Sequence, residues 1–471
     1  MQAVSNTQLG IHYAIFYEPG KIAFPGGMRL ETNEPALFMI KSADNGVEQV
    51  TVADPTRKLE KITFRLEFAT GSDTTITVQL PQGTLAGKSL RLDAIPKTAN
   101  TFLLRSDTFA AHRDRIWEGD TALSADLDSV LRAADKALTR GPYSVMEKEK
   151  VPPSGDKHDY MSVGPYWWPD TTKPDGLPYI RKDGQTNPER FAINDAQYLK
   201  NLCADVQLLA VSYYFTQNDK YAAHAAKLLS VWFLDAQTNM NPNLNFGQSI
   251  PGITDGRGIG LIDTWSLVKL LDATQLLKSS RYWEKDKHAQ LQAWVGEFLR
   301  WMRESDIGKD EADEHNNHGT YYDAQVVGYA LFVGDTALAR QTLERQTKAR
   351  LESQLEADGS QPHELARTRS WSYSLMNLTG FFTLARLGDN MGIDLWNYQT
   401  PQGKSIGKAF DYLRPYALQQ QPWTRPQLGD MDVNGFYKLM AFDGQQYLSE
   451  RPDKDKLDRV SPFNRLTGSF L

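Results

Sequence analysis

The amino-acid sequence predicts a molecule of two parts, an antiparallel β-sandwich over residues 1–105 and an all-α domain over residues 106–471. Before residue 105, short runs rich in Val, Ile, Thr and Phe alternate with turn residues, whereas from about residue 120 the apolar residues recur with a helical period. The composition, 41% hydrophobic and 23% charged over 471 residues, is that of a globular protein and excludes global disorder.

Five runs in the first part are typical of strands. Ile62, Phe64 and Leu66 alternate with polar residues, which is the period of a half-buried strand. The remaining runs are similarly rich in apolar and β-branched residues: Ala36–Ile40, Glu48–Val52, Thr75–Leu80 and Ser89–Leu92. We therefore expect a sandwich built from strands joined by short turns.

The second part carries helical stripes. Leu123, Leu127 and Val130 begin a stripe with spacings of four and three residues. Similar stripes cover Tyr198–Phe215, Tyr221–Leu234, Trp265–Leu277, Leu291–Met302, Thr336–Leu355, Tyr373–Leu387 and Ile406–Leu418. At least eight helices with few strands between them predict helical hairpins. Two long insertions, Gly141–Arg190 and Asn239–Gly260, interrupt them, and structureless loops of this length are usually functional.

Charge and composition exclude several classes of function. A net charge of -6 argues against a nucleic-acid partner and requires a locally basic cleft for any anionic substrate. No apolar run reaches the roughly 18 residues of a membrane helix. The single cysteine, Cys203, excludes an intramolecular disulfide framework. We expect no membrane partner, no protein partner and no cofactor.

A cluster of amides and imidazoles spans residues 314–323, EHNNHGTYYD. In one interpretation, Asn316 or Asn317 only caps a helix over Tyr321–Leu331. In the other, Asn317 and His318 offer hydrogen-bond donors to an anion. Metal binding is disfavoured, because His315 and His318 lack a third ligand at a recognised spacing. The segment His363–Arg367 likewise lacks the second histidine of a zinc-protease motif.

A second cluster spans residues 364–374, ELARTRSWSYS. Arg369 and Tyr373 are four residues apart and would share a helix face. A guanidinium beside a phenol favours the phenolate, so we expect the pKa of Tyr373 to be lowered. In the alternative interpretation, Tyr373 is a core aromatic residue whose hydroxyl is hydrogen-bonded.

Four blocks in the same order resemble the alginate-lyase superfamily of polysaccharide lyases, in particular the uronan lyases that carry a Pro-Tyr-Trp-Trp-Pro loop. They are PPSGDKHDYMSVGPYWWPD (152–170), NFGQSIPGITDGRGIGLIDT (245–264), HNNHGTYYDAQ (315–325) and ELARTRSWSYSLMNL (364–378). Residues 37–64 are similar to the C-terminal β-sandwich of chondroitin, hyaluronan and xanthan lyases. In those lyases the sandwich follows the catalytic toroid, so its place here implies a rearranged or truncated architecture.

The resemblance implies an (α/α) toroid, an incomplete barrel, that cleaves uronic-acid polymers by β-elimination. It implies that Asn317, His318 and an arginine neutralise the uronate carboxylate while Tyr373 moves the proton. Arg367 and Arg369 are both candidates, and we prefer Arg369 because of the shared helix face. Candidates for substrate binding are Lys157, His158, Tyr160, Trp167, Trp168, Gln248, Arg257 and Tyr322.

One tyrosine can both remove H5 and protonate O4 only where the two lie on the same face of the sugar ring. This holds for mannuronate and glucuronate and fails for guluronate and galacturonate. We therefore expect an anionic polysaccharide rich in mannuronate or glucuronate as the substrate. The first ten residues lack the basic and apolar regions of a signal peptide, yet such polymers occur outside the cytoplasm, so we expect a secreted or periplasmic protein.

Two other functions stay open at this point. A glycoside hydrolase on a related toroid would pair two carboxylates, and Asp323, Glu364 and Asp263 are the candidates. A glycan-binding protein would use the aromatic loops without any catalysis. An unsaturated product separates the lyase from both alternatives.

Overall fold

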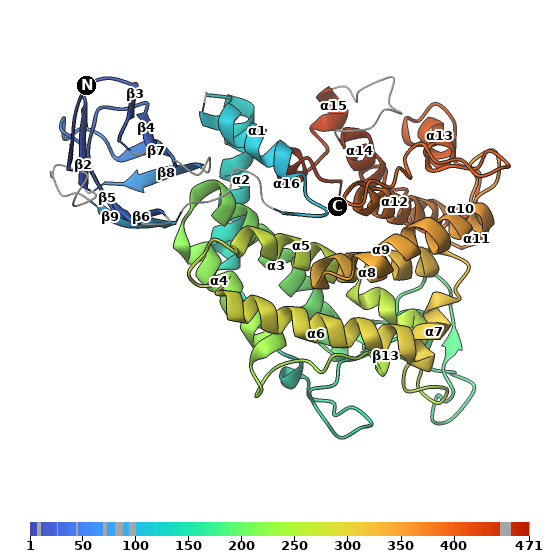
Figure 1. Ribbon diagram of the computed structural model, residues 1–471. Coiled ribbons are helices and arrows are strands. Elements are labelled where there is room, and N and C mark those ends of the chain that lie inside the picture. Colours follow the sequence, from blue (N-terminus) through green and yellow to red (C-terminus); the bar gives the residue numbers. More distant parts are fainter. Residues whose placement is uncertain are drawn as a thin grey trace.

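The computed structural model describes residues 1–6, 11–25, 27–43, 46–68, 73–80, 88–93, 100–117, 119–442 and 454–470. Strands β1–β9 gather at one end of the molecule and the helices lie beside them (Figure 1). The expected fold class, a β-sandwich followed by an α-helical toroid, is confirmed.

The sandwich consists of two antiparallel sheets. Its strands are β1 (Gln2–Asn6), β2 (Ile11–Phe16), β3 (Gly20–Ala23), β4 (Arg29–Thr32), β5 (Ala36–Ala43), β6 (Gly46–Ala53), β7 (Lys61–Glu67), β8 (Asp73–Gln79) and β9 (Lys88–Asp93). One sheet has the order β1-β2-β5-β6-β9 and the other has the order β3-β4-β7-β8. Each of the five predicted runs matches one of the strands β5–β9, and the runs in β7 and β8 extend one residue beyond the strand.

The alternation of apolar and polar residues in β7 turns the apolar face of the strand toward the core. Ile62, Phe64 and Leu66 are fully buried, as the period of two requires. Phe38 of β5 meets Phe64 of β7 with ring centroids 5.0 Å apart, so the core forms where the inner faces of the two sheets meet.

The helical part begins at Ser106. Its helices are α1 (Ser106–Trp117), α2 (Thr121–Ala137), α3 (Asp195–Thr216), α4 (Asp219–Leu229), α5 (Leu267–Leu277), α6 (Lys285–Glu304), α7 (Asp306–Ala312), α8 (Asn317–Val333), α9 (Thr336–Gln341), α10 (Lys348–Gln354), α11 (Pro362–Leu365), α12 (Ser370–Asp389), α13 (Ile406–Ala417), α14 (Asn434–Ala441), α15 (Lys454–Leu457) and α16 (Pro462–Thr467). Helices α3, α5, α8 and α12 bury most of their residues and form the inner layer. Two glycines allow these helices to approach closely. A Cβ on Gly328 would lie 2.4 Å from Val268, and one on Gly380 would lie 2.9 Å from Thr320.

Two predicted helices are interrupted. The stripe over Thr336–Leu355 is α9, a π-helical turn (Thr342–Thr347) and α10. The stripe over Tyr221–Leu234 is α4 followed by a π-helical turn (Ser230–Leu234). Helices α1, α7, α11, α14, α15 and α16 were not predicted. All but α1 have eight residues or fewer, too few for a long apolar stripe, and in α1 the charged Arg113 interrupts the stripe between Phe109 and Ile116. Among the described residues, no helix is long and apolar enough to span a membrane.

Buried ion pairs join the sandwich to the helices. Asp73 of β8 accepts hydrogen bonds from Arg65 of β7 and from Arg113 of α1, and the Arg113 and Asp73 side chains are buried. The Arg113 guanidinium also lies 5.1 Å from the Tyr214 ring of α3. Arg113 and Asp73 therefore neutralise each other where β8 meets α1, while Nε and Nη1 of Arg113 are buried without a hydrogen-bond partner among the described residues. A domain division at residue 105 stays our proposal.

The two long insertions meet over the inner helices. Strand β10 (Met161–Val163) of the first pairs in parallel with β13 (Phe246–Ser249) of the second. The backbone N–H of Gln248 also donates to the Ser162 hydroxyl over 2.8 Å. Within the first insertion, β11 (Trp167–Trp168) pairs with β12 (Ile180–Arg181). These pairings hold the aromatic loop and the Asn- and Gly-rich loop side by side.

Candidate active site

A cavity of about 460 Å³ lies between the two insertions, the start of α8 and the start of α12. It is lined by side chains from all of these segments, among them Tyr166, Trp167, Asn317, His318, Arg367 and Tyr373. The two motifs that were expected from the sequence to be catalytic, residues 314–323 and 364–374, therefore meet at one cavity.

His318 lies in the first turn of α8, where Asn316 caps the helix by accepting the His318 N–H over 2.9 Å. The imidazole Nδ1 lies 2.9 Å from Oε1 of Glu311, a fully buried carboxylate of α7. Burial alone would lower the pKa of His318, but the Glu311 carboxylate outweighs it and raises the pKa. The arrangement favours an imidazolium at the cavity wall.

Asn317 is held by Glu364 of α11. The Glu364 carboxylate accepts the backbone N–H of Asn317 over 2.6 Å and its side-chain Nδ2 over 2.9 and 3.1 Å. Burial raises the pKa of Glu364 against these hydrogen bonds. Asn317 Oδ1 is buried without a hydrogen-bond partner in the described part of the chain, so the amide is positioned from one side only. Of the two capping candidates, Asn316 makes the side-chain cap.

Tyr373 lies in the first turn of α12 and lines the same cavity. Its hydroxyl donates to the Tyr166 hydroxyl over 2.8 Å, and the Arg367 guanidinium lies 3.9 Å from its ring centroid. Burial, followed by the Tyr166 hydrogen bond, raises the pKa of Tyr373 well above 10 despite Arg367. The expected lowering of this pKa is therefore wrong for the free protein, because desolvation outweighs the cation.

The arginine at the cavity is Arg367 and not Arg369. Arg367 donates to Asp183 from Nε over 3.3 Å and from Nη2 over 2.9 Å, which fixes its guanidinium over Tyr373. Arg369 does not line the cavity. Our preference for Arg369 assumed a face shared with Tyr373 on one helix, and this premise is wrong. Helix α12 begins at Ser370, and Arg369 has the non-helical dihedrals φ -120° and ψ 56°.

A further arginine, Arg257, enters the cavity from the second insertion. It donates to the Gln248 carbonyl over 3.1 Å and to the Gln248 side chain over 3.0 Å, and it lies 5.9 Å from the Trp167 ring. Gln248 adopts a left-handed backbone with φ 48°, a strained conformation for a non-glycine residue. Within the described residues Arg257 forms no ion pair with a carboxylate, so its charge is available to an anion. Trp167, Gln248 and Arg257 thus line the cavity as expected.

Five other candidates lie outside the cavity and are corrected here. Tyr160 is fully buried and donates to Asp263 over 3.1 Å, and Tyr322 is buried and donates to the Met302 carbonyl over 3.1 Å. Trp168 donates to the Gln185 carbonyl over 3.0 Å, and the His158 ring bonds the Asn239 carbonyl.

Lys157 is the fifth, and it too is absent from the cavity wall. Its carbonyl accepts a hydrogen bond from Lys148 over 2.7 Å. The first insertion contains four of these candidates, whose side chains or backbones stabilise it, whereas Tyr322 of α8 contacts α6 through the Met302 carbonyl. Motif membership does not reveal which way a side chain points.

The three carboxylates that were candidates for a hydrolase all accept hydrogen bonds from other side chains. Asp323 accepts from Arg350 Nε over 2.8 Å and from Nη2 over 3.1 Å, and Glu364 holds Asn317. Asp263 accepts from Tyr160, Ser162 and Gln248. None of the three lines the cavity, and Glu314, the carboxylate that does, has no second carboxylate beside it among the described lining residues, so no pair of carboxylates faces a bond placed there.

Four residues of the site escaped sequence reasoning. Tyr166 lies within the Pro-Tyr-Trp-Trp-Pro loop but was not singled out. Glu311, Asp183 and Arg181 carried no signal, since all three lie outside the four motif blocks. Asp183, for example, accepts from Arg367, which lies 184 residues away. The described residues contain no group of three or more His, Cys, Asp and Glu side chains that could hold a metal ion.

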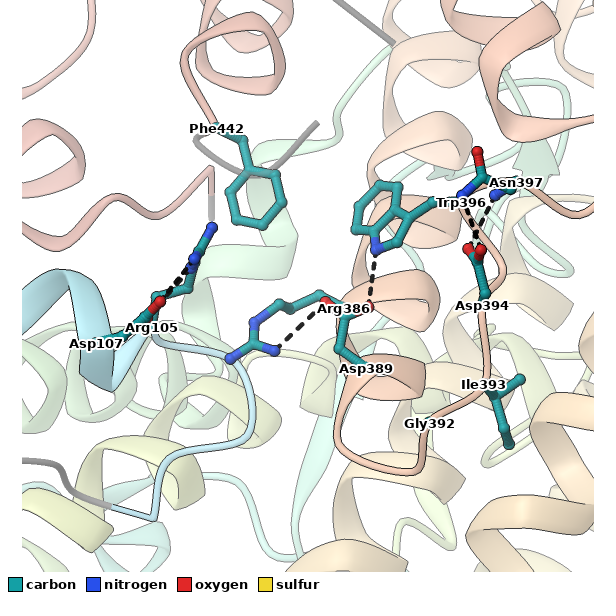
Figure 2. A pocket seen from close by; sticks show the side chains of 10 residues that line it. All are labelled: Arg105, Asp107, Arg386, Asp389, Gly392, Ile393, Asp394, Trp396, Asn397 and Phe442. Atoms are coloured by element: carbon teal, nitrogen blue, oxygen red, sulfur yellow. Dashed lines mark hydrogen bonds and ion pairs between the residues drawn. The ribbon is translucent and has the colours of Figure 1, made fainter. Parts of the chain in front are cut away.

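A larger cavity of about 570 Å³ lies elsewhere, between α1 and the end of α12 (Figure 2). Its charged groups are matched to one another: Arg105 pairs with Asp107 over 2.6 Å, and Arg386 with Asp389 over 3.5 Å. None of the candidate catalytic residues lines it. We therefore place the candidate active site in the smaller cavity, where Tyr373 and Arg367 meet Arg257, a cation without a carboxylate partner among the described residues.

Comparison with known proteins identifies the family of the chain. The family described as alginate lyase matches residues 144–423, and the polysaccharide lyase family 8 C-terminal beta-sandwich domain matches residues 1–63. An alginate lyase from Bacteroides ovatus of known structure is 36% identical with a TM-score of 0.73, and the match covers 79% of this chain and 99% of that one.

Two further relatives match more weakly. Alginate lyase A1-III from Sphingomonas species A1 is 17% identical with a TM-score of 0.48, over 78% of this chain and 95% of that one. Chondroitinase-AC from Pedobacter heparinus is 32% identical over 93 residues, which are 20% of this chain and span only 13% of that relative's length. From the match over residues 144–423 and the Bacteroides ovatus structure, we conclude that the chain belongs to the alginate lyase family of polysaccharide lyases.

Proposed function

We propose that this protein cleaves a uronic-acid polysaccharide by β-elimination, with Tyr373 moving the proton. One observation carries the proposal: the Tyr373 hydroxyl opens onto the same cavity as His318, Asn317 and the cations Arg257 and Arg367. The cations give an acidic chain of net charge -6 the basic cleft that a polyanion needs.

The chemistry begins at C5 of the uronate. Removing H5 builds charge on the neighbouring carboxylate, and donors from His318, Asn317 and an arginine stabilise that charge as it develops. The C5–H electron pair becomes the C4–C5 double bond, and the bond from C4 to O4 breaks with its electrons. Tyr373 takes the proton from C5 and delivers it to O4, so that the enzyme is regenerated.

The raised pKa of Tyr373 describes the protein without substrate. The Tyr373 hydroxyl already donates to Tyr166, which gives its proton a route out of the pocket, and the stacked Arg367 stabilises the phenolate once it forms. A phenolate of high pKa is a strong base, which suits a carbon acid as weak as C5.

A single tyrosine limits the substrate to sugars with H5 and O4 on one face. The proposed substrates are therefore mannuronate-rich alginate and glucuronate-containing chains. Since such polymers are extracellular, we propose that the protein acts outside the cytoplasm.

The test is the ultraviolet absorbance of the unsaturated uronate, measured on poly-mannuronate, poly-guluronate, glucuronan, hyaluronan and chondroitin. We expect absorbance to rise on the mannuronate and glucuronate polymers and to be lost in Tyr373→Phe. The matched control is Tyr221→Phe, which also loses one hydroxyl hydrogen bond, over 2.9 Å to Asp135, on an outer helix.

Other outcomes would overturn parts of the proposal. Activity confined to poly-guluronate keeps the lyase but refutes the single-tyrosine mechanism. Release of reducing ends without absorbance indicates a hydrolase. Binding of a polymer without any cleavage indicates a glycan-binding protein.

A further inference from the structure

A second cavity, of about 480 Å³, adjoins the candidate active site. The two cavities share Pro165, Gln248 and Ile262 in their walls. The second cavity then continues between α3 and the segment that leads from Asp263 into α5. A chain lying in the active site and passing Gln248 would therefore enter it.

Cations dominate the wall of the second cavity. Arg190, Lys200 and Lys269 all line it, and none of them forms an ion pair with a carboxylate within the described part of the chain. The carboxylate in the wall, Asp263, already accepts hydrogen bonds from Ser162 over 2.6 Å and from Gln248 over 3.0 Å. Three unmatched cations against one satisfied carboxylate make a local excess of positive charge in a chain of net charge -6.

Trp265 gives the same cavity an aromatic wall. Its ring packs edge-on against Tyr321, with centroids 5.2 Å apart and an interplanar angle of 68°, which fixes its orientation. Lys269 Nζ lies 4.1 Å from the Trp265 ring centroid. An aromatic face beside cations suits a sugar that carries a carboxylate, since the ring contacts C–H groups while the cations meet the charge.

We propose that the second cavity binds a neighbouring uronate residue of the same polysaccharide chain, with Lys269 and Lys200 meeting its carboxylate beside Trp265. The proposal rests on the proposed function and extends it: the protein prefers polymers and long oligosaccharides to the shortest chain that it cleaves. Nothing in the four sequence motifs pointed to Lys200 or Lys269.

The state of Lys269 supports this role. Burial, followed by the nearby Lys438 of α14, lowers the pKa of Lys269 to about 7, and Cys203 of α3 opposes this only weakly. The other charged groups in the cavity wall are Arg190, Lys200 and Asp263. A carboxylate arriving beside Lys269 supplies the missing counter-charge and restores the ammonium.

The experiment measures kcat/KM of wild type for a ladder of oligouronates from the shortest cleaved chain to the polymer. The same measurements are made on the double lysine variant, which combines Lys200→Met and Lys269→Met, and on the single variant Trp265→Phe. Lys227→Met is the matched control, because Lys227 is an exposed lysine of α4 that lines neither cavity.

We expect kcat/KM of wild type to rise with chain length. The ratio of kcat/KM for long over short chains should fall about tenfold in the double lysine variant, which corresponds to two charge pairs of about 0.7 kcal/mol each. Added salt should reduce the ratio in wild type more than in the variant, since screening acts on the cations that the variant lacks. Lys227→Met should keep the wild-type ratio.

Two results would overturn the inference. An equal loss on the shortest and longest chains would show that the lysines act on the fold or on the first cavity. An unchanged ratio in all variants would show that the second cavity binds no sugar.

Failure of the proposed function is seen separately. Wild type would then form no unsaturated product, and calorimetry of oligouronate binding to Tyr373→Phe, with and without the lysine substitutions, would still decide whether the second cavity binds uronate.

Discussion

Replacing Glu311 by glutamine tests the charge on His318 without changing the size of the side chain. Nδ1 of His318 lies 2.9 Å from Glu311 Oε1, while Oε2 of this fully buried carboxylate has no hydrogen-bond partner among the residues that the structure describes. Glutamine keeps an oxygen at the position of Glu311 Oε1, so that it can still accept a hydrogen bond from His318 Nδ1. It removes the negative charge that holds the pKa of His318 above its ordinary value of 6.5.

The expected loss of activity follows from counting protons on the ring. Beside Glu311 the imidazolium carries a proton on each nitrogen, so Nδ1–H donates to Glu311 and Nε2–H can donate to the substrate carboxylate. Beside glutamine a neutral ring keeps its single proton on Nδ1, and the Nε2 lone pair then faces the carboxylate. Removing one preorganised donor of this kind costs about 100- to 1,000-fold in kcat, or ~2.7–4 kcal/mol.

Two measurements check this reasoning. The rate of formation of unsaturated product gives kcat and KM, and an NMR titration of the histidine rings gives the pKa of His318, which should fall below 6.5 in Glu311→Gln. Glu304→Gln, an exposed carboxylate at the end of α6, is the control. A variant with lowered His318 pKa and wild-type kcat would refute the role given to the imidazolium. An unchanged pKa would refute the pairing with Glu311.

Two further predictions concern Arg367 and Lys269. Arg367→Lys should lower kcat/KM at least tenfold, because lysine cannot keep both the two contacts to Asp183 and the stack on Tyr373. Arg369→Lys, outside the cavity, should lower kcat/KM less. A larger loss of kcat/KM in Arg369→Lys than in Arg367→Lys would restore Arg369 as the proposed catalytic arginine. The pKa of Lys269 is about 7 in the folded protein and 10.5 ordinarily, so the unfolded chain binds more protons between these values. The free energy of unfolding of wild type relative to Lys269→Met should therefore rise with pH across this window, by at most about 1.4 kcal/mol per pH unit. Urea unfolding at several pH values measures this difference. A difference that stays flat or falls with pH would show that Lys269 is normally solvated.

Much of the fold could be predicted from the sequence because its signals are local. The alternation of Ile62, Phe64 and Leu66 defines β7, and the apolar stripes define most of the long helices, since periods of two and 3.6 residues are properties of a single segment. The π-helical turns escaped, because an apolar stripe continues through them with little change. The motifs proposed to be catalytic were also visible, because Asn317, His318 and Tyr373 each lie in a contiguous block.

The sequence by itself determined the two-part architecture, the residue types at the site and the family that they resemble. Only the tertiary structure decided which arginine reaches Tyr373, because Arg367 is fixed by Asp183 from a separate insertion and α12 begins one residue after Arg369. It also decided the charge states. Burial, which sets the cost of a charge, raises the pKa of Tyr373, while Glu311 raises that of His318, and neither effect can be read from neighbours along the chain.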